Sequence, residues 1–400
     1  MRQPLTGITI ADFTQLMQGG WAAQKLGDMG ADVIKIEPPR GEPSRHYSAA
    51  GKFHEGVSPY FLTMNRNKRS LPIDLKSDEG REVALDVIAE ADVLMQNFRP
   101  GVMERLGLSY EDVQQVNDDI IYVSASGYGS TGPYSDRPGQ DLLYQAMTGL
   151  TSYTGRSDDP PTPAGTVVID EHSATSIALN VMFALFHRDR TGQGQKLDAS
   201  LLNSAVDLQC QEATIALNMD VDVERGRKTH GHPTLWPPYG VYEATDGYIA
   251  IGMADLHHVA DTLDVDGLEQ YDSEREQFEH RDEIHDAIEA ATSEMSAERV
   301  VEDLVDVDVQ AVEMSGIEDL PDNPQIQHNE MLMEVEHPNG GTYTTTGSPV
   351  ELSETPMEVR QRPPRRGEHS VAVLQEIGYE DSEIDRLVDG GIVLVEEDEE

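Results

Sequence analysis

One carboxylate, Asp170, lies near the middle of a stretch whose residue types can carry out chemistry. The four residues before it, 166–169, are all β-branched, which is typical of a short buried strand. After it, Ile177, Val181, Ala184 and Leu185 recur at helical spacing, so we expect a core-facing helix that begins a few residues beyond the carboxylate. The pattern therefore places Asp170 where a strand passes into a helix.

A carboxylate at such a junction has two interpretations. As an N-cap, it accepts hydrogen bonds from the free N–H groups of the first helical turn. As a nucleophile or general base, it lies in a pocket at the carboxyl end of a strand, where open α/β sheets bind their ligands. The local pattern around Asp170 is compatible with both.

The composition excludes several classes of partner. Lys and Arg number 29 and Asp and Glu number 74, which gives a formal net charge of −45. A surface of this charge repels nucleic acid and anionic membranes, so neither is an expected partner. The acidic residues are spread along the chain, and the apolar content suffices for a core, which favours a folded protein in a cytoplasm rich in salt. We interpret the chain as halophilic and archaeal.

Other features of the sequence limit its location and its cofactors. Cys210 is the only cysteine, which allows no internal disulfide and no cysteine metal cluster. The histidines show no metal-ligand spacing, so no metal is expected. The N-terminus lacks the apolar region of a signal peptide, and no stretch is long and apolar enough to span a bilayer. We therefore expect a cytoplasmic protein.

The chain begins with the pattern of a βαβ unit. Residues 5–13 and 31–37 are strand-like, and residues 19–30 between them are helical and end in glycine. Further alternation predicts an α/β fold with a doubly wound sheet, from strands at 70–75, 92–98 and 120–125 and a helix at 77–90. Gln18-Gly19-Gly20 departs from the dinucleotide fingerprint, so a nicotinamide-binding oxidoreductase is a weaker alternative.

After about residue 200 the regular alternation of strand and helix patterns ends. A long helix at 201–219 is followed by a turn-rich connection, a hairpin at 240–252 and charged helices at 255–308. Strand and turn patterns then return from 334, and a helix at 370–389 ends the pattern. We expect a large domain from residues 1–224, a small domain at 225–330, and a C-terminal part at 331–400 that returns to the large domain.

Several phrases, taken together and in order, resemble the class III coenzyme A transferases, the group of formyl-CoA transferase, the carnitine-CoA transferases and the 2-methylacyl-CoA racemases. They extend over nearly the whole chain, and the ordered set is specific although each phrase alone is common. The phrases are Ala11-Asp12-Phe13-Thr14, Gly19-Gly20-Trp21-Ala22, LGDMGADVIKIEPPRGEPSR at 26–45, Asn67-Lys68-Arg69-Ser70, Asn97-Phe98-Arg99-Pro100-Gly101, SASGYGSTGPY at 124–134, the Asp170 stretch with its glycine-rich end at 191–195, and Gly367-Glu368-His369.

The resemblance implies a Rossmann-like large domain built from both chain ends, a smaller inserted α+β domain, and an interlocked homodimer. It also places Asp170 on the family's catalytic aspartate. Its carboxylate would attack the thioester of an acyl-CoA donor to form a mixed anhydride, which the CoA thiolate converts into an aspartyl-CoA thioester. A carboxylic acid acceptor then completes the exchange. CoA enters as a thioester substrate, and no permanently bound cofactor is implied.

The same resemblance suggests where CoA binds. Lys68 and Arg105 match nucleotide-binding positions of the family, and Gln15 matches a CoA-contacting position. Basic residues are scarce in this chain, which makes those in the shared phrases informative. The predicted CoA-binding residues are Gln15, Gln18, Arg40, Asn67, Lys68, Arg69, Asn97, Arg99 and Arg105.

Two departures from the family pattern bear on the reaction. The racemases have a histidine where this chain has Gln140, and an amide does not accept a proton at neutral pH. This favours a transferase, with an acyl-CoA racemase and a non-catalytic CoA-binding protein as alternatives. Gly252 and Met253 match the loop that covers the aspartate, although the run of glycines in formyl-CoA transferase is missing, which argues against a formyl substrate. Asp141 is either an acid behind the nucleophile or the start of a helix.

The acyl groups are the least constrained part of the prediction. Arg45, His46 and Arg156 are candidates to meet the second carboxylate of a dicarboxylic acid. Succinyl-CoA as donor, with mesaconate or another C4 to C5 dicarboxylate as acceptor, is the working hypothesis. Surface ion pairs explain the same three residues equally well.

Overall fold

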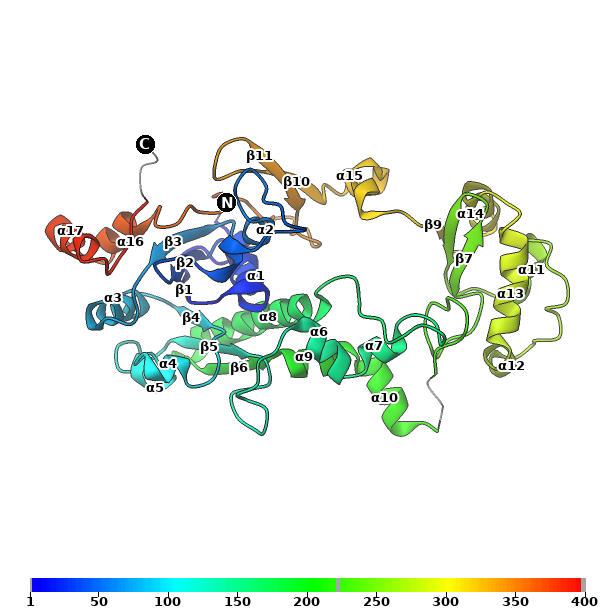
Figure 1. The fold of residues 1–400 in the computed structure, drawn as a ribbon, viewed down its shortest axis with the longest axis horizontal. Coiled ribbons are helices and arrows are strands. Elements are labelled where there is room, and N and C mark those ends of the chain that lie inside the picture. Colours follow the sequence, from blue (N-terminus) through cyan, green and yellow to red (C-terminus); the bar gives the residue numbers. More distant parts are fainter. Residues whose placement is uncertain (1, 221–223, 397–400) are drawn as a thin grey trace. The chain divides into compact units, whose positions relative to one another are not determined.

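The computed structural model describes residues 2–220 and 224–396. The chain divides into two compact units, and each is built from more than one segment (Figure 1). The first unit comprises Met1–Tyr144, Val167–Leu208 and Gln325–Glu400, and the second comprises Gln145–Thr166 and Gln209–Pro324. The second unit thus includes residues 145–166 and 209–224, which the sequence pattern assigned to the large domain.

A six-stranded parallel sheet forms the centre of the first unit. Its order, β3-β2-β1-β4-β5-β6, is that of a doubly wound Rossmann sheet, whose chain direction across the sheet reverses between β1 and β4. The two strands at this switch point are in register at Ile10 and Val93. The mixed α/β class and the parallel sheet expected from the sequence are confirmed. The strands are β1 (Thr9–Asp12), β2 (Asp32–Glu37), β3 (Lys68–Pro72), β4 (Val93–Gln96), β5 (Ile121–Ser126) and β6 (Lys196–Ser200).

Helices cover both faces of the sheet. On one face, apolar residues of α1 and α8 pack against β1, β2, β4 and β5. On the other face, α3 and the two C-terminal helices α16 and α17 close a second core (Figure 1). The bounds of these five helices, and of four further helices along the same part of the chain, are α1 (Leu16–Asp28), α3 (Asp78–Ala89), α4 (Val102–Arg105), α5 (Tyr110–Val113), α6 (Asp141–Met147), α8 (Val168–Thr191), α9 (Leu201–Leu208), α16 (Ser370–Glu376) and α17 (Asp381–Asp389).

Several local predictions were wrong. Residues 166–169 form no strand, because α8 begins at Val168 and its first turn contains Asp170. The helix expected at 201–219 is two helices, α9 and α10 (Cys210–Asn218), and the one expected at 370–389 is also two. Strand β6 was not predicted, because Lys196–Ser200 alternates between exposed and half-buried residues and has no apolar run.

The second unit contains its own small core. Strands β7 and β8 form the expected antiparallel hairpin, and β9 extends it to three strands. Helices α11, α13 and α14 pack apolar residues against these strands. The bounds in this unit are α7 (Leu150–Tyr153), β7 (Gly240–Ala244), β8 (Gly247–Ile251), α11 (Leu256–Thr262), α12 (Glu274–Glu279), α13 (Arg281–Thr292), α14 (Ala297–Val305), β9 (Ala311–Glu313) and a 3₁₀ turn, Ile317–Asp322.

Short elements complete the first unit. The hairpin of β10 and β11 packs Val335 and Tyr343 against Leu62 of α2. The remaining bounds are a 3₁₀ turn at Pro43–His46, α2 (Pro59–Met64), α15 (Pro324–His328), β10 (Leu332–Glu336) and β11 (Thr342–Thr346). Among the described residues, none of the helices combines the length and the apolarity that a membrane crossing needs.

Candidate active site

Asp170 lies in the first turn of α8, and its surroundings are built by the starts of two helices. The N-cap residue of α8 is Val167, so the Asp170 side chain does not cap its own helix. That task belongs to Asp141, whose carboxylate accepts hydrogen bonds from the backbone N–H groups of Ile169 (2.8 Å) and Asp170 (2.9 Å). Since Asp141 satisfies these donors, the Asp170 carboxylate remains available for other partners.

The second helix start belongs to α1. Its residue Gln18 donates a backbone hydrogen bond to the Asp170 carboxylate. The Gln18 side chain also donates to the Ser173 hydroxyl of α8 at 3.0 Å, which ties the two helices together beside the carboxylate. The N-terminal ends of helices carry partial positive charge and favour an anion at this place.

Burial and a neighbouring negative charge oppose the ionisation of Asp170. Burial, and next the charge of Asp141, raise the pKa of Asp170 to about 7, although the Gln18 hydrogen bond lowers it. At neutral pH, both ionisation states of this carboxyl group are therefore well populated. A group whose pKa lies near the operating pH suits nucleophilic or acid-base chemistry.

Asp170 opens into a cavity of about 640 Å³ at the carboxyl ends of β1, β4 and β5. This edge is where doubly wound sheets bind ligands, and the volume is that of a typical small-molecule site. The wall includes five of the predicted residues, namely Gln15, Gln18, Asn97, Arg99 and Gln140, together with Asp141. It also includes residues that the sequence analysis did not select, among them Tyr47, Tyr60, Ser126 and Arg137.

Asn97 lies in the cavity wall, and its side chain also holds the backbone of Gln15. Its side-chain oxygen accepts from the Gln15 backbone N–H (2.8 Å), and its side-chain nitrogen donates to the Gln15 carbonyl (2.7 Å). Both ends of the amide are thus used to hold the Gln15 backbone, so Asn97 shapes the cavity wall.

Three predicted CoA-binding residues lie away from the cavity, with their side chains engaged inside the fold. Lys68 is fully buried, where its ammonium lies 2.9 Å from Asp12 and donates to the Gly20 carbonyl (3.0 Å). Asn67 donates to Asp28, and Arg69 is paired with Asp32 and Glu376. The three side chains therefore have polar partners inside the fold, and their binding to the nucleotide stays a prediction.

The other predicted residues are accessible. Arg40 lies exposed in a turn before the first 3₁₀ helix, and Arg105 is exposed on α4. Gly252 and Met253 follow β8 in the second unit, where Met253 is 57% exposed. Their roles in binding stay predictions.

Two of the three residues proposed to meet a second carboxylate form ion pairs within the chain, and the third, His46, contacts the Arg40 carbonyl. Arg45 is paired with Glu37 at 2.7 Å, and Arg156 is paired with Asp159 at 3.3 Å. The cavity instead presents Arg99 and Arg137, which have no ion pair with any described carboxylate. Arg137 stacks on the Tyr134 ring at 3.7 Å. The scarcity of basic residues would have pointed to Arg137, which lies three positions before Gln140.

Asp170 is thus a partly buried aspartate at two helix N-termini, in a cavity at the switch point of a doubly wound sheet, where sheets of this kind bind their ligands. The chain belongs to CoA-transferase family III, which it matches over residues 5–370. This membership establishes the chain as a CoA-transferase and sets aside the nicotinamide-binding alternative.

Relatives extend over nearly the full length of the chain. It is 35% identical over 389 residues to the succinyl-CoA:mesaconate CoA-transferase of Haloarcula marismortui, across 94% of this chain and 97% of the relative. It is 32% identical over 402 residues to the succinyl-CoA:glutarate CoA-transferase of Homo sapiens, across 98% of this chain and 90% of the relative. The crystal structure of a CaiB/BaiF family protein from Brucella suis has a TM-score of 0.83 at 28% identity, and the match covers 94% of this chain and 100% of that one.

Proposed function

We propose that Asp170 is the nucleophile that carries CoA from an acyl-CoA donor to a carboxylic acid acceptor. The observation that supports this most strongly is its position in the cavity, with its own helix capped by Asp141 and a hydrogen bond from the Gln18 backbone. The ionised carboxylate attacks the thioester carbonyl, and the C–S bond breaks to give a mixed anhydride and CoA thiolate. The thiolate then attacks the aspartyl carbonyl, which releases the donor acid and leaves an aspartyl-CoA thioester.

The second half of the exchange repeats these steps in reverse. The acceptor carboxylate attacks the aspartyl-CoA thioester and forms a new anhydride as the thiolate leaves. The thiolate then attacks the acceptor's carbonyl, so the acyl-CoA product departs and the Asp170 carboxylate is restored. The N–H of Gln18 is placed to stabilise negative charge on the Asp170 carboxyl oxygens each time they are released.

We further propose succinyl-CoA as donor and a C4 to C5 dicarboxylate such as mesaconate as acceptor. Two relatives are named for succinyl-CoA with mesaconate or glutarate. Within the cavity, Arg99 and Arg137 are the cations able to meet the phosphates of CoA or the second carboxylate of a dicarboxylic acid. Arg40 and Arg105 are exposed and available for the nucleotide.

A homodimer is also proposed, and the surface of α8 supports it. Leu179, Met182, Phe183 and Phe186 are large apolar residues on α8 that are 38–58% exposed. Their clustering on one long helix marks a surface suited to association. We also infer that the enzyme is halophilic and cytoplasmic, from its net charge of −45.

The mechanism is tested by trapping the intermediate. Incubation with succinyl-CoA in high salt, followed by hydroxylamine and mass spectrometry, should convert Asp170 into a hydroxamate. Glu171→Gln, which changes an exposed carboxylate of the same helical turn, should leave this adduct unchanged, whereas Asp170→Asn should abolish both adduct and turnover. Trapping at another carboxylate, or turnover that survives Asp170→Asn, would contradict the proposal.

The racemase alternative has its own signature. Gln140 lies in the cavity wall, where its amide offers no base for a proton transfer. Incorporation of deuterium beside the thioester, without any need for an acceptor acid, would favour the racemase. We expect no such incorporation.

A further inference from the structure

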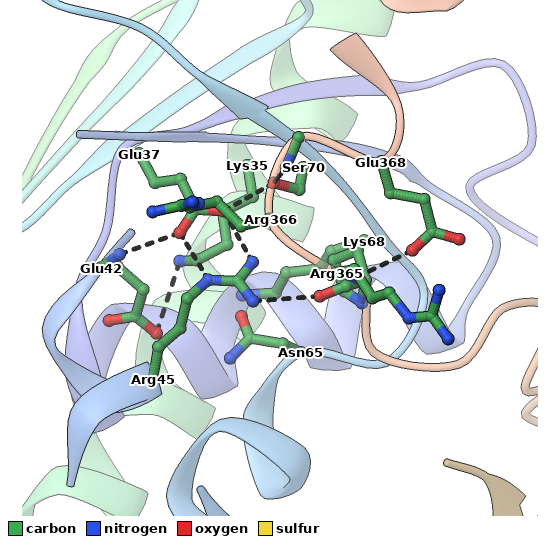
Figure 2. A network of polar contacts seen from close by, with 12 residues as sticks. Lys35, Glu37, Glu42, Arg45, Asn65, Lys68, Ser70, Arg365, Arg366 and Glu368 are labelled. Carbon is green, nitrogen blue, oxygen red and sulfur yellow. Dashed lines mark hydrogen bonds and ion pairs between the residues drawn. The ribbon is translucent and has the colours of Figure 1, made fainter. Parts of the chain in front are cut away.

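A cluster of buried charged residues lies next to the turn that leads into α1. These residues do not face the substrate cavity, so substrate binding does not explain why they are charged. Lys35 and Glu42 have side chains that are only 1% and 2% exposed, and their charged atoms are 3.8 Å apart (Figure 2). Neither residue lines the cavity. Burying charges is costly unless they are paired and hydrogen-bonded, so the specific contacts of this pair need an explanation.

Those contacts converge on three consecutive backbone positions at the start of α1. Lys35 donates to the Thr14 carbonyl at 3.0 Å, and the Leu16 backbone N–H donates to the Glu42 carboxylate at 3.2 Å. Between them, the Gln15 backbone is held on both sides by Asn97. Side chains from three separate segments therefore fix the turn.

The turn needs this support because its backbone is strained. Leu16 has a φ of +58°, in the left-handed region that residues with side chains rarely adopt. Such a conformation persists only where the surrounding structure enforces it, and it is common near functional groups. Glu42 accepts the N–H of this strained residue itself.

The direction of the first turn of α1 depends on Leu16. Two residues later, the Gln18 backbone N–H faces the Asp170 carboxylate in the cavity wall, and the Gln18 side chain donates to the Ser173 hydroxyl of α8 at 3.0 Å. If Leu16 relaxed to an ordinary φ, the Gln18 N–H would point elsewhere. The buried carboxylate and the nucleophile are thus linked through three backbone positions.

We propose that Glu42 is a positioning residue that holds Leu16 in its left-handed conformation and thereby keeps the Gln18 N–H on the Asp170 carboxylate. The inference rests on the proposed role of Asp170 and extends it to the Gly41-Glu42-Pro43-Ser44-Arg45 phrase. Glu42 stays ionised in this role: burial alone would raise the pKa of Glu42, but Lys35 and the Ser44 hydrogen bonds outweigh it and hold that pKa below its ordinary value.

The test is the pH dependence of the Glu42→Gln variant. Without the Gln18 hydrogen bond, the pKa of Asp170 rises, and we expect the acidic limb of kcat/KM to move up by about one pH unit. A shift of that size lowers the ionised fraction at pH 7 about fivefold. We therefore expect about a fivefold loss of kcat at pH 7 that is recovered above pH 9, with less than about a twofold change in KM.

A second readout does not depend on turnover. A protonated carboxyl group transfers its proton to carbodiimide and its oxygen adds to the central carbon, so the extent of Asp170 labelling, measured by mass spectrometry, should fall as the pH rises through its pKa. The labelling midpoint should shift with the kinetic limb in Glu42→Gln. The other charged or titratable groups around Asp170 are Asp141 and Tyr144 of α6 and Tyr47, Tyr60, Arg99 and Arg137 of the cavity wall, and all of them are unchanged in this variant.

Asp28→Asn provides a matched control. Asp28 is also a buried carboxylate of the first unit, but it pairs with Arg66 (2.7 Å) and does not contact the turn. This control should lose thermal stability and keep the wild-type midpoint. Glu42→Asp keeps the charge with a shorter reach, so it should give a smaller shift of the same sign if Glu42→Gln does not fold.

A folded Glu42 variant with an unchanged midpoint would overturn the positioning role. Failure of the proposed function would give a different result, because wild-type protein would then yield no hydroxamate at Asp170. The midpoint of carbodiimide labelling could still be compared between wild type and variants in that case.

Discussion

Asp170 is ionised with difficulty because it is half-buried and faces the charge of Asp141. In the proposed mechanism the carboxylate form is the nucleophile, so we expect kcat/KM to rise with pH and to reach half of its plateau near pH 7, the pKa of Asp170. A rate profile measured from pH 5 to 9 at constant high salt would test this expectation. A profile that is flat across neutrality would contradict the assignment.

The same pKa predicts an effect on stability. The folded-state pKa of Asp170, about 7, lies above its ordinary value of 3.8, so folding becomes less favourable as the pH rises between these values. Asp170→Asn should therefore stabilise the protein above pH 7, and this gain should disappear below about pH 4. We expect about 2 kcal/mol, less than the full shift implies, because the side chain is partly open to solvent. Denaturant unfolding at pH 8 and pH 4 would measure it.

Substitution of Lys68 distinguishes a structural role of this residue from a role in CoA binding. Its partner Asp12 is equally buried, so Lys68→Met leaves a carboxylate unpaired in the core and should cost about 3–5 kcal/mol of unfolding free energy. The KM for acyl-CoA of the folded variant should stay near the wild-type value. Arg40→Gln, at an exposed position, should do the reverse, with a higher KM and unchanged stability. A raised KM in folded Lys68→Met would restore the nucleotide-binding interpretation.

The N-terminus of α8 is capped by Asp141, which lies outside that helix. Its carboxylate caps two N–H groups and also raises the pKa of Asp170 by its charge. Asp141→Asn should cost about 1 kcal/mol of stability through the weaker cap. It should also move the acidic limb of kcat/KM to lower pH, the opposite direction to the Glu42 variants. Glu171→Gln should change neither quantity, and a limb that stays in place in Asp141→Asn would show that its charge does not reach Asp170.

The same elements show what the sequence could predict. The β1-α1-β2 unit was predictable because two apolar runs flank a helical pattern that ends in glycine. Residues 166–169 were assigned wrongly because four β-branched or apolar residues fit a buried helix start as well as a strand. Asp170 was identified through the family resemblance, whereas the burial of Lys68 and the strained φ of Leu16 arise from tertiary contacts that a linear pattern does not encode.

The exposed apolar residues of α8 bear on how two chains associate. If the apolar surface of α8 is a dimer interface, then Phe183→Glu combined with Phe186→Glu should break it, since both side chains are more than half exposed in the single chain. We expect a monomeric or unfolded product by sedimentation analysis in high salt. Val371→Glu, at an exposed apolar residue of α16, is the control and should keep the wild-type mass. A double variant that remains a dimer would exclude this surface.

Charge acts on the molecule as a whole. With a net charge of −45, the folded chain repels itself, and at low ionic strength this repulsion reaches across distances of about 30 Å, against about 3 Å at 1 M salt. We therefore expect the thermal midpoint to rise steadily between about 0.1 and 2 M KCl and activity to follow it. A neutral osmolyte at matched osmolarity should not replace the salt, because it does not screen charge. A thermal midpoint independent of KCl would show that ion pairs such as Arg66 with Asp28 already compensate the excess acid, and the halophilic interpretation would then be wrong.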